Sequence, residues 1–197
     1  TTGVDENIVN MTYKEVRRLD AGSWYSDEYK GEKVPGLREV LELAQGKIKL
    51  NIELKPADNG EELARKTVAL IEKYNMENDC VITSFSSSAL LAAKSCNENI
   101  RVGYILSAAY GDYYDMKNID FFSVNAAFLS KRTIDAIHNS GKQVYAWTVN
   151  NKDSIKNLTN KGVDGVITDN PVLARETIYS RDTSETIVNM IRYVFNQ

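Results

Sequence analysis

Residues 48–56 read IKLNIELKP, in which apolar and polar side chains alternate. This period of two predicts a β-strand. Its apolar face carries Ile52 and Leu54, which we expect to pack beneath helices. Five further short apolar runs follow, and several are rich in Val and Ile, which is typical of strands buried on both faces of a parallel sheet. The six predicted strands cover residues 48–54, 80–83, 101–106, 120–124, 143–149 and 165–168.

Helical patterns separate these runs. Between the first two strands, Leu63, Val68 and Ile71 lie near one helical face, opposite Glu and Lys side chains. Later in the chain, Ser130 can cap a helix that Gly141 ends. We therefore expect each strand to be followed by a helix. The predicted helices cover residues 61–74, 86–95, 130–139 and 152–161, and another begins near residue 171.

Repeated strand–helix units predict an α/β fold with a parallel sheet. Right-handed crossovers then favour either an open doubly wound sheet or a closed barrel. The sequence lacks both the dinucleotide fingerprint GxGxxG and the P-loop motif, which makes an open nucleotide-binding fold a weaker alternative. An eight-stranded TIM barrel takes about 250 residues. We expect a TIM (β/α)8-barrel-type fold in which this 197-residue chain holds about six of the eight units.

Two segments fall outside the strand–helix alternation. Residues 4–36 hold no clear strand and are rich in aromatic residues and glycine, so we expect an ordered loop or a small insertion there. Residues 184–197 place apolar side chains at helical spacing, which predicts an amphipathic last helix. The expected organisation is a partial barrel domain over residues 1–183, which includes the insertion, followed by the helix at 184–197.

Composition and charge exclude several classes of function. The formal net charge of −3 argues against non-specific nucleic-acid binding, which needs clustered Lys and Arg to neutralise phosphates. Cys80 and Cys96 form no CxxC pair, so a zinc site is not expected. We favour two buried free thiols over a disulfide. No run approaches the roughly 18 to 20 apolar residues of a membrane helix. These features leave the cellular compartment open.

The polar face of the first strand carries the strongest candidate site. Asn51, Glu53 and Lys55 share this face and would point into a barrel interior, just before Pro56. A carboxylate and an ammonium inside a barrel cost free energy unless they are paired or bind a ligand. A buried structural ion pair is the alternative. The carboxyl end of a barrel strand is where reacting groups lie, so we favour an active-site pair.

Other candidate residues have simpler explanations. Trp147, near the end of the strand at 143–149, would by itself be an ordinary core aromatic. Asp169 and Asn170 can cap the helix that Pro171 begins. The single histidine, His138, lies on a helix at the opposite end of its unit from a barrel active site. We expect His138 to be a surface or helix-end residue rather than a catalyst.

Seven motifs occur in a fixed order along the chain. They are TTG at residues 1–3, LDAGSW at 19–24, VPGLREVL at 34–41, IELK at 52–55, TSF at 83–85, AWTVN at 146–150 and GVDGVITDNP at 162–171. Each is weak alone, but the set is specific. Together they resemble the middle of a glycerophosphodiester phosphodiesterase, and they span the chain to about residue 179.

The resemblance implies a fold, a reaction and four site residues. The fold is a TIM barrel with a small insertion after its second strand, which matches residues 4–36. The reaction cleaves glycerophosphodiesters to glycerol 3-phosphate and an alcohol with a divalent cation, Ca²⁺ or Mg²⁺. The resemblance implies that Glu53 is a metal ligand and that Lys55 is a catalytic residue that contacts the phosphate. It also implies that Trp147 and Phe85 line the substrate site.

The resemblance also implies groups that have no counterpart in this sequence. On its first two strands the family carries two histidines, the general acid and base, and a Glu-x-Asp metal pair. Because Ca²⁺ takes about 6 to 8 oxygen ligands, Glu53 alone would not hold it firmly. We expect an N-terminally truncated member of the family that is inactive alone. It would need its missing N-terminal segment or a homo-oligomeric partner.

Two other functions are compatible with this sequence. One is a non-catalytic binding or scaffold module that derives from such a barrel. The other is a related barrel phosphodiesterase that acts on phospholipid head groups, such as a phospholipase D-like toxin. Histidines and a Glu-x-Asp pair upstream of Thr1 would separate the enzyme from the scaffold, because only the enzyme needs groups that transfer protons.

Overall fold

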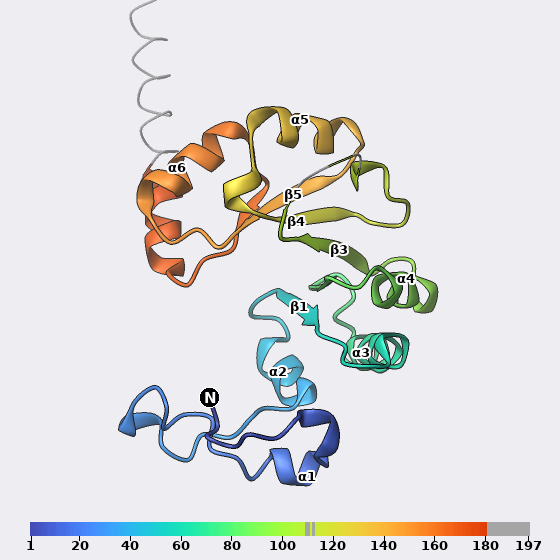
Figure 1. Ribbon diagram of the computed structural model, residues 1–197, viewed down its shortest axis with the longest axis vertical. Coiled ribbons are helices and arrows are strands. Elements are labelled where there is room, and N and C mark those ends of the chain that lie inside the picture. Colours follow the sequence, from blue (N-terminus) through green and yellow to red (C-terminus); the bar gives the residue numbers. More distant parts are fainter. Residues whose placement is uncertain (109–110, 112, 181–197) are drawn as a thin grey trace, which may run out of the picture.

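The computed structural model describes residues 1–108, 111 and 113–180. One parallel sheet of six strands runs in the order β1-β2-β3-β4-β5-β6 and curls into a half-barrel, with helices on its outer side (Figure 1). Sequential order and parallel pairing confirm the predicted α/β fold of the TIM-barrel type. The strands are β1 Leu50–Leu54, β2 Cys80–Ser84, β3 Arg101–Leu106, β4 Phe121–Asn125, β5 Gln143–Trp147 and β6 Gly165–Val166.

Side-chain caps begin the helices that cover the sheet, and a glycine in the left-handed region, Gly162 at φ 93°, ends α6. The capping side chains that accept a backbone N–H are Asn59 for α3, Ser86 for α4, Ser130 for α5 and Asn151 for α6. The helices are α1 Tyr13–Val16, α2 Leu37–Ala44, α3 Gly60–Lys73, α4 Ser87–Cys96, α5 Lys131–Asn139 and α6 Lys152–Lys161, and residues 171–180 are also helical.

The connection from β3 to β4 does not follow the prediction of a helix after every strand. Its described residues, 107–108, 111 and 113–120, contain only the short 3-10 turn Tyr113–Asp115. The segment has no apolar stripe of helical period, so nothing in it favours a helix packed on the sheet. The helix predicted at 184–197 and the domain boundary at 183 lie outside the described residues.

Helix α2 is an element that the sequence analysis missed. Its buried residues are Leu41 and Ala44, and Leu37 packs against the same core. The spacing of these residues was a usable signal, since positions i, i+4 and i+7 lie on one helical face. This helical spacing was overlooked because the preceding residues, Pro35 and Gly36, are typical of loops.

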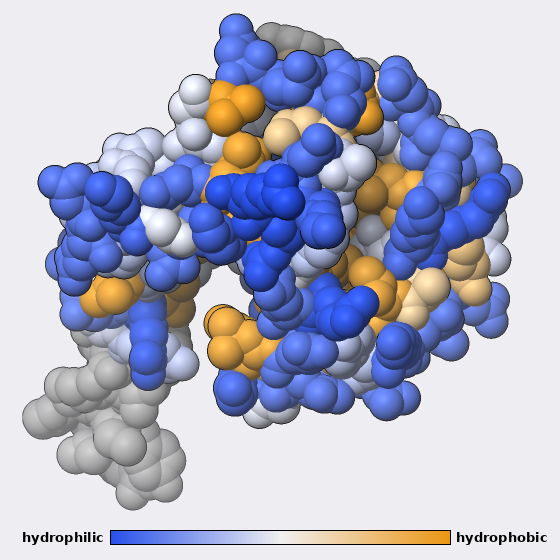
Figure 2. All heavy atoms as spheres, turned by 90° about the horizontal axis from the view of Figure 1, so that it is seen from below, coloured by the Kyte–Doolittle hydropathy of each residue, from blue (hydrophilic) through white to orange (hydrophobic). Residues whose placement is uncertain are grey.

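The segment before α2 is ordered mainly by local polar contacts. Asp20 accepts the backbone N–H groups of Ser23, Gly22 and Gly31, and these bonds hold the pKa of its carboxyl well below the ordinary value. Arg17 pairs with Glu39 of α2 at 2.9 Å. Seen from below, this side of the molecule is mostly hydrophilic, with hydrophobic side chains in separate groups (Figure 2). No strand of the sheet lies in this segment, as predicted, because the first strand, β1, begins at Leu50.

The predicted faces of β1 and α3 are mostly correct. Leu54 is buried, and Ile52 packs against the same core. In α3, Val68 and Ile71 are buried as expected, but Leu63 is exposed. The reason is geometric: Leu63 is five residues before Val68, which turns it about 140° away around the helix axis. Ala64, one turn before Val68, occupies the buried position instead.

The two thiols lie in different environments. Cys80 is buried at the start of β2, and burial raises the pKa of its thiol to about 11. Cys96 ends α4 and is exposed, so the prediction of two buried thiols was wrong for this residue. Its helix buries Ala89, Leu90 and Ala93, and Cys96 is the last residue of that helix. Among the residues that the structure describes, no helix has the length and apolar character to span a bilayer.

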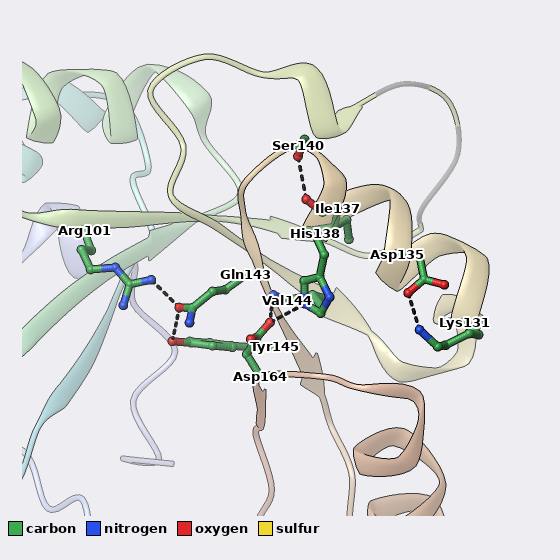
Figure 3. A network of polar contacts seen from close by, with 10 residues as sticks. All are labelled: Arg101, Lys131, Asp135, Ile137, His138, Ser140, Gln143, Val144, Tyr145 and Asp164. Atoms are coloured by element: carbon green, nitrogen blue, oxygen red, sulfur yellow. Dashed lines mark hydrogen bonds and ion pairs between the residues drawn. The ribbon is translucent and has the colours of Figure 1, made fainter.

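Aromatic side chains fill the amino-terminal half of the half-barrel interior. Phe121 is fully buried, and its ring centroid lies 4.7 Å from that of Tyr145. The Arg101 guanidinium lies 5.6 Å from the Phe121 centroid. It also donates a hydrogen bond to Gln143 (Figure 3). Gly103 is the neighbour of Phe121 in the register of β3 and β4. A Cβ atom at Gly103 would lie 2.1 Å from a carbon of that ring, so the position requires glycine.

Gly103→Ala is expected to lower the free energy of unfolding by about 1–3 kcal/mol, because the added methyl overpacks against a buried ring. Urea unfolding followed by circular dichroism measures this loss. The same substitution in a Phe121→Leu background should cost less, since the clashing ring atoms are gone. An equal loss in both backgrounds would show that the ring does not set the requirement for glycine.

Candidate active site

A cavity of about 530 Å³ opens where the strands end. Alternation along each strand turns every second side chain toward this interior. The three polar residues predicted from the first strand, Asn51, Glu53 and Lys55, all line it, as do Phe85 and Trp147. The structure therefore brings together every site residue that the sequence predicted. The remaining lining residues are Thr83, Ile105, Ser123, Thr148 and Ile167.

Glu53 and Lys55 lie side by side with their charged groups open to solvent. The Lys55 Nζ atom is 3.6 Å from Glu53 Oε2, and the two side chains are 77% and 35% exposed, respectively. An ion pair this exposed contributes about 0–1 kcal/mol to stability. The alternative of a buried structural ion pair is thus wrong for these residues. Both charges face the cavity without a structural need, which favours a role toward a ligand.

Hydrogen bonds fix the strand ends beneath this pair. Thr83 is buried on β2, and its hydroxyl donates to Asn51 Oδ1 at 3.0 Å. The buried Ser84 hydroxyl donates to the Leu54 carbonyl at 2.8 Å and accepts the Ser86 N–H. These side chains tie the ends of β1 and β2 together. The polar face of β1 is therefore held in place on its inner side.

Two aromatic residues form one wall of the cavity. The Trp147 indole N–H donates to the Ser123 carbonyl at 2.9 Å, which fixes the ring on the inner side of β5. Its ring meets Phe85 edge to face, with centroids 6.2 Å apart and planes at 88°. Trp147 is only partly buried and Phe85 is 49% exposed. Both rings thus present apolar surface to the cavity rather than to the core.

The described part of the chain does not by itself provide a site for a divalent cation. Glu53 is the only carboxylate among the residues that line the cavity. Within the described residues, no three His, Cys, Asp or Glu side chains are grouped so that they could hold a metal ion. Ca²⁺ takes about six to eight oxygen ligands, so one carboxylate and a neighbouring amide are too few. The described residues therefore offer the cavity one carboxylate, Glu53, and no complete metal site.

His138 lies away from the cavity, as predicted. It is exposed in the last turn of α5, and its Nε2 atom is 2.9 Å from Asp164 Oδ2. The same Asp164 oxygen accepts the N–H of Val144, at the start of β5 (Figure 3). The cavity opens at the opposite ends of the strands. His138 therefore supports the amino-terminal end of the sheet.

The predicted helix caps near residue 170 are half correct. Asn170 accepts the Leu173 N–H at 3.1 Å and caps the helix as expected. Asp169 does not cap it, because its carboxylate accepts the Asn150 side-chain N–H at 2.7 Å.

Sequence reasoning also missed Thr83, Ile105 and other lining residues. These residues are recognised only because they lie on the inner face of the strands. That placement depends on the register between neighbouring strands, which the sequence alone does not give.

The model of the "Glycerophosphoryl diester phosphodiesterase family" matches residues 1–173. The chain belongs to this family. Its members are glycerophosphodiester phosphodiesterases, and they generally depend on a divalent cation. The organisation found here, a cavity at the strand ends of a parallel half-barrel, is the part of the family fold that this chain contains.

Individual relatives agree with the family assignment. A glycerophosphodiester phosphodiesterase of Caldanaerobacter subterraneus is 26% identical over 202 residues, which cover 98% of this chain and 76% of that protein. One from Bacillus altitudinis is 27% identical over 87% of this chain and 73% of its own length. Among solved structures, an Oleispira antarctica phosphodiesterase in complex with the product sn-glycerol-3-phosphate is 29% identical, with a TM-score of 0.79, over 90% of this chain and 74% of that one.

Proposed function

We propose that this cavity binds the glycerol phosphate part of a glycerophosphodiester, which the family reaction cleaves to glycerol 3-phosphate and an alcohol. The observation that carries the proposal is the exposed Glu53–Lys55 pair at the end of β1, facing an aromatic wall. Membership of the family supports it. So does the similar Oleispira antarctica enzyme, whose structure holds sn-glycerol-3-phosphate.

Lys55 is proposed to contact the phosphate. Its ammonium lies beyond the end of β1, and 77% of its side chain is exposed, so a phosphate oxygen can reach it. A fixed positive charge stabilises the negative charge on phosphate oxygens, and more strongly when ligand and walls exclude water. Glu53, at 3.6 Å, orients the ammonium toward the cavity before substrate arrives.

Glu53 is proposed to supply one carboxylate ligand to Ca²⁺ or Mg²⁺. Hard cations prefer oxygen ligands, and Glu53 is the carboxylate that faces the cavity. A bound divalent cation would polarise phosphoryl oxygens. The other ligands would have to come from outside the described residues, since these contain no second carboxylate at the cavity.

Trp147 and Phe85 are proposed to form the wall against the glycerol carbons. Their exposed faces offer apolar area next to two charged groups, a combination that suits a ligand with a carbon chain and a phosphate. Because the Ser123 carbonyl and the Phe85 edge fix Trp147, little side-chain freedom is lost when a ligand binds.

Proton transfer is the step for which the described residues that line the cavity offer no histidine. The only histidine of the sequence, His138, is bonded to Asp164 at the far end of the sheet. General acid–base groups contribute about 10²–10⁴-fold in rate. We propose that hydrolysis needs acid and base groups beyond this chain. The same observation favours the second candidate function, a barrel-derived binding or scaffold module without catalysis.

The purified chain is expected to bind sn-glycerol 3-phosphate in the presence of Ca²⁺ and to show no turnover of glycerophosphocholine. Lys55→Met should weaken binding by about tenfold or more, because a hydrogen bond to a charged group contributes about 1.5–3 kcal/mol. The chain alone should gain no affinity from Ca²⁺, whereas in the presence of a segment that supplies the remaining metal ligands Glu53→Gln should reduce the gain that Ca²⁺ gives. Titration calorimetry measures both effects, and a coupled assay for released choline measures turnover.

Matched controls lie at the other end of β1. Lys49→Met and Glu77→Gln make the same chemical changes near the start of the strands, so neither should alter binding. Unchanged affinity in Lys55→Met would contradict the phosphate contact. Metal-dependent turnover by the chain alone would show that its proton-transfer groups lie within these residues.

The outer strands of the sheet suggest how the chain works with other units. Among the described residues, β1 pairs only with β2, and β6 pairs only with β5. Free strand edges expose unpaired N–H and C=O groups, which favour pairing with another segment. We propose that further strand–helix units, on another segment or on a second copy of the chain, cover these edges.

The isolated chain is therefore expected to self-associate as its concentration rises. Sedimentation velocity over a wide range of concentration measures this, and hydrophobic dye binding reports exposed interior surface. A chain that stays monomeric throughout and binds no dye would contradict the proposal. That result would mean that the present units protect both edges themselves.

A further inference from the structure

The loops that follow β5 and β6 are joined beyond the ends of the regular strands. The Val149 N–H donates to the Ile167 carbonyl at 2.9 Å, and the Ile167 N–H donates to the Ala146 carbonyl at 2.8 Å. Ile167 lines the cavity together with Trp147 and Thr148. One wall of the cavity is therefore built from the end of β5 with the loop after it and from the loop after β6, which helix α6 separates in the sequence.

The side chain of Asn150 connects these two loops. Its amide nitrogen donates to Asp169 Oδ2 at 2.7 Å. Its amide oxygen accepts the Asp169 N–H at 2.9 Å and the Thr168 hydroxyl at 3.1 Å. A single side chain on the first loop thus makes three hydrogen bonds to two successive residues of the second loop.

These contacts require an amide at position 150. The amide offers a donor and an acceptor on one planar group, and both are used. An aspartate in its place would keep the acceptor but would turn its other oxygen toward the Asp169 carboxylate. Two carboxylates at hydrogen-bond distance repel unless they share a proton. The geometry at position 150 therefore favours Asn over Asp, although the two side chains have the same shape.

We propose that Asn150, with Asp169 as its partner, is a positioning residue that fixes the Trp147 wall of the cavity. Asn150 lies three residues after Trp147, and its bonds prevent the first loop from moving away from the second. The Ser123 carbonyl fixes the indole from the strand side, and Asn150 fixes the backbone that carries it. The ligand-binding consequence rests on the function proposed above, whereas the positioning of Trp147 does not.

The test uses Trp147 as its own reporter. The chain has two tryptophans, so Trp24→Phe leaves Trp147 as the only tryptophan, which can be excited selectively at wavelengths that tyrosine does not absorb. In that background Asn150→Asp is expected to shift the emission maximum of Trp147 to the red and to increase quenching by acrylamide. Adding Asp169→Asn to Asn150→Asp restores a donor opposite an acceptor, so both signals should return to those of the parent.

Asn151→Asp is the matched control, because it makes the same chemical change one residue later. Asn151 caps α6 by accepting the Ser154 N–H, and Asp caps helices equally well. This variant should leave Trp147 unchanged. If Asn150→Asp fails to fold by circular dichroism, Asn150→Ala removes the same bonds without adding a charge, and the same change in Trp147 is expected.

A second measurement follows the ligand. Binding of sn-glycerol 3-phosphate should weaken by about tenfold, or 1.4 kcal/mol, in Asn150→Asp and recover in the double variant. If the parent chain binds no ligand, the proposed function fails, but the fluorescence result still decides the positioning role. Unchanged Trp147 signals in the Asn150 variants, no recovery in the double variant, or an equal change in Asn151→Asp would each overturn the inference.

Discussion

Parallel pairing in strict sequence order is the constraint on which the site depends. In the register of the sheet, Glu53 pairs with Thr83, Thr83 with Gly103 and Gly103 with Phe121. Glu53 is the fourth residue of β1, whereas Phe121 is the first of β4. These four neighbouring residues thus run from the open, carboxyl end of the half-barrel to its aromatic, amino-terminal end, as the tilt of barrel strands requires. This stagger separates a charged, open end from a packed, apolar one.

The polar residues at the two ends of the sheet differ in the contacts that they make. At the amino-terminal end, one Asp164 oxygen contacts both His138 and a strand N–H, and Arg101 contacts an aromatic ring and an amide. At the carboxyl end, Glu53 and Lys55 have only each other, at 3.6 Å, among the residues that the structure describes. Stability accounts for the first set of contacts. It does not account for the second, which is why a ligand is the better explanation there.

Local pattern predicted most of this architecture, and its failures have physical causes. Alternation at residues 48–56 was enough to place Asn51, Glu53 and Lys55 on one face, because the period of a strand is fixed by its backbone. Thr83 and Ile167 could not be placed, since their facing depends on register with other strands. Asp169 was expected to cap a helix, but its carboxylate accepts a hydrogen bond from Asn150, 19 residues earlier, instead. Contacts of this range leave no local signal.

The central claim is that this half-barrel presents a phosphate site at the end of β1, although no histidine is among the described residues that line the cavity. A crystal structure of the chain with sn-glycerol 3-phosphate and Ca²⁺ tests it most directly. The account predicts a phosphate oxygen about 2.7–3.0 Å from Lys55 Nζ, with the glycerol carbons against Trp147. A phosphate bound instead beside Arg101 and Lys142, at the amino-terminal end of the sheet, would contradict it.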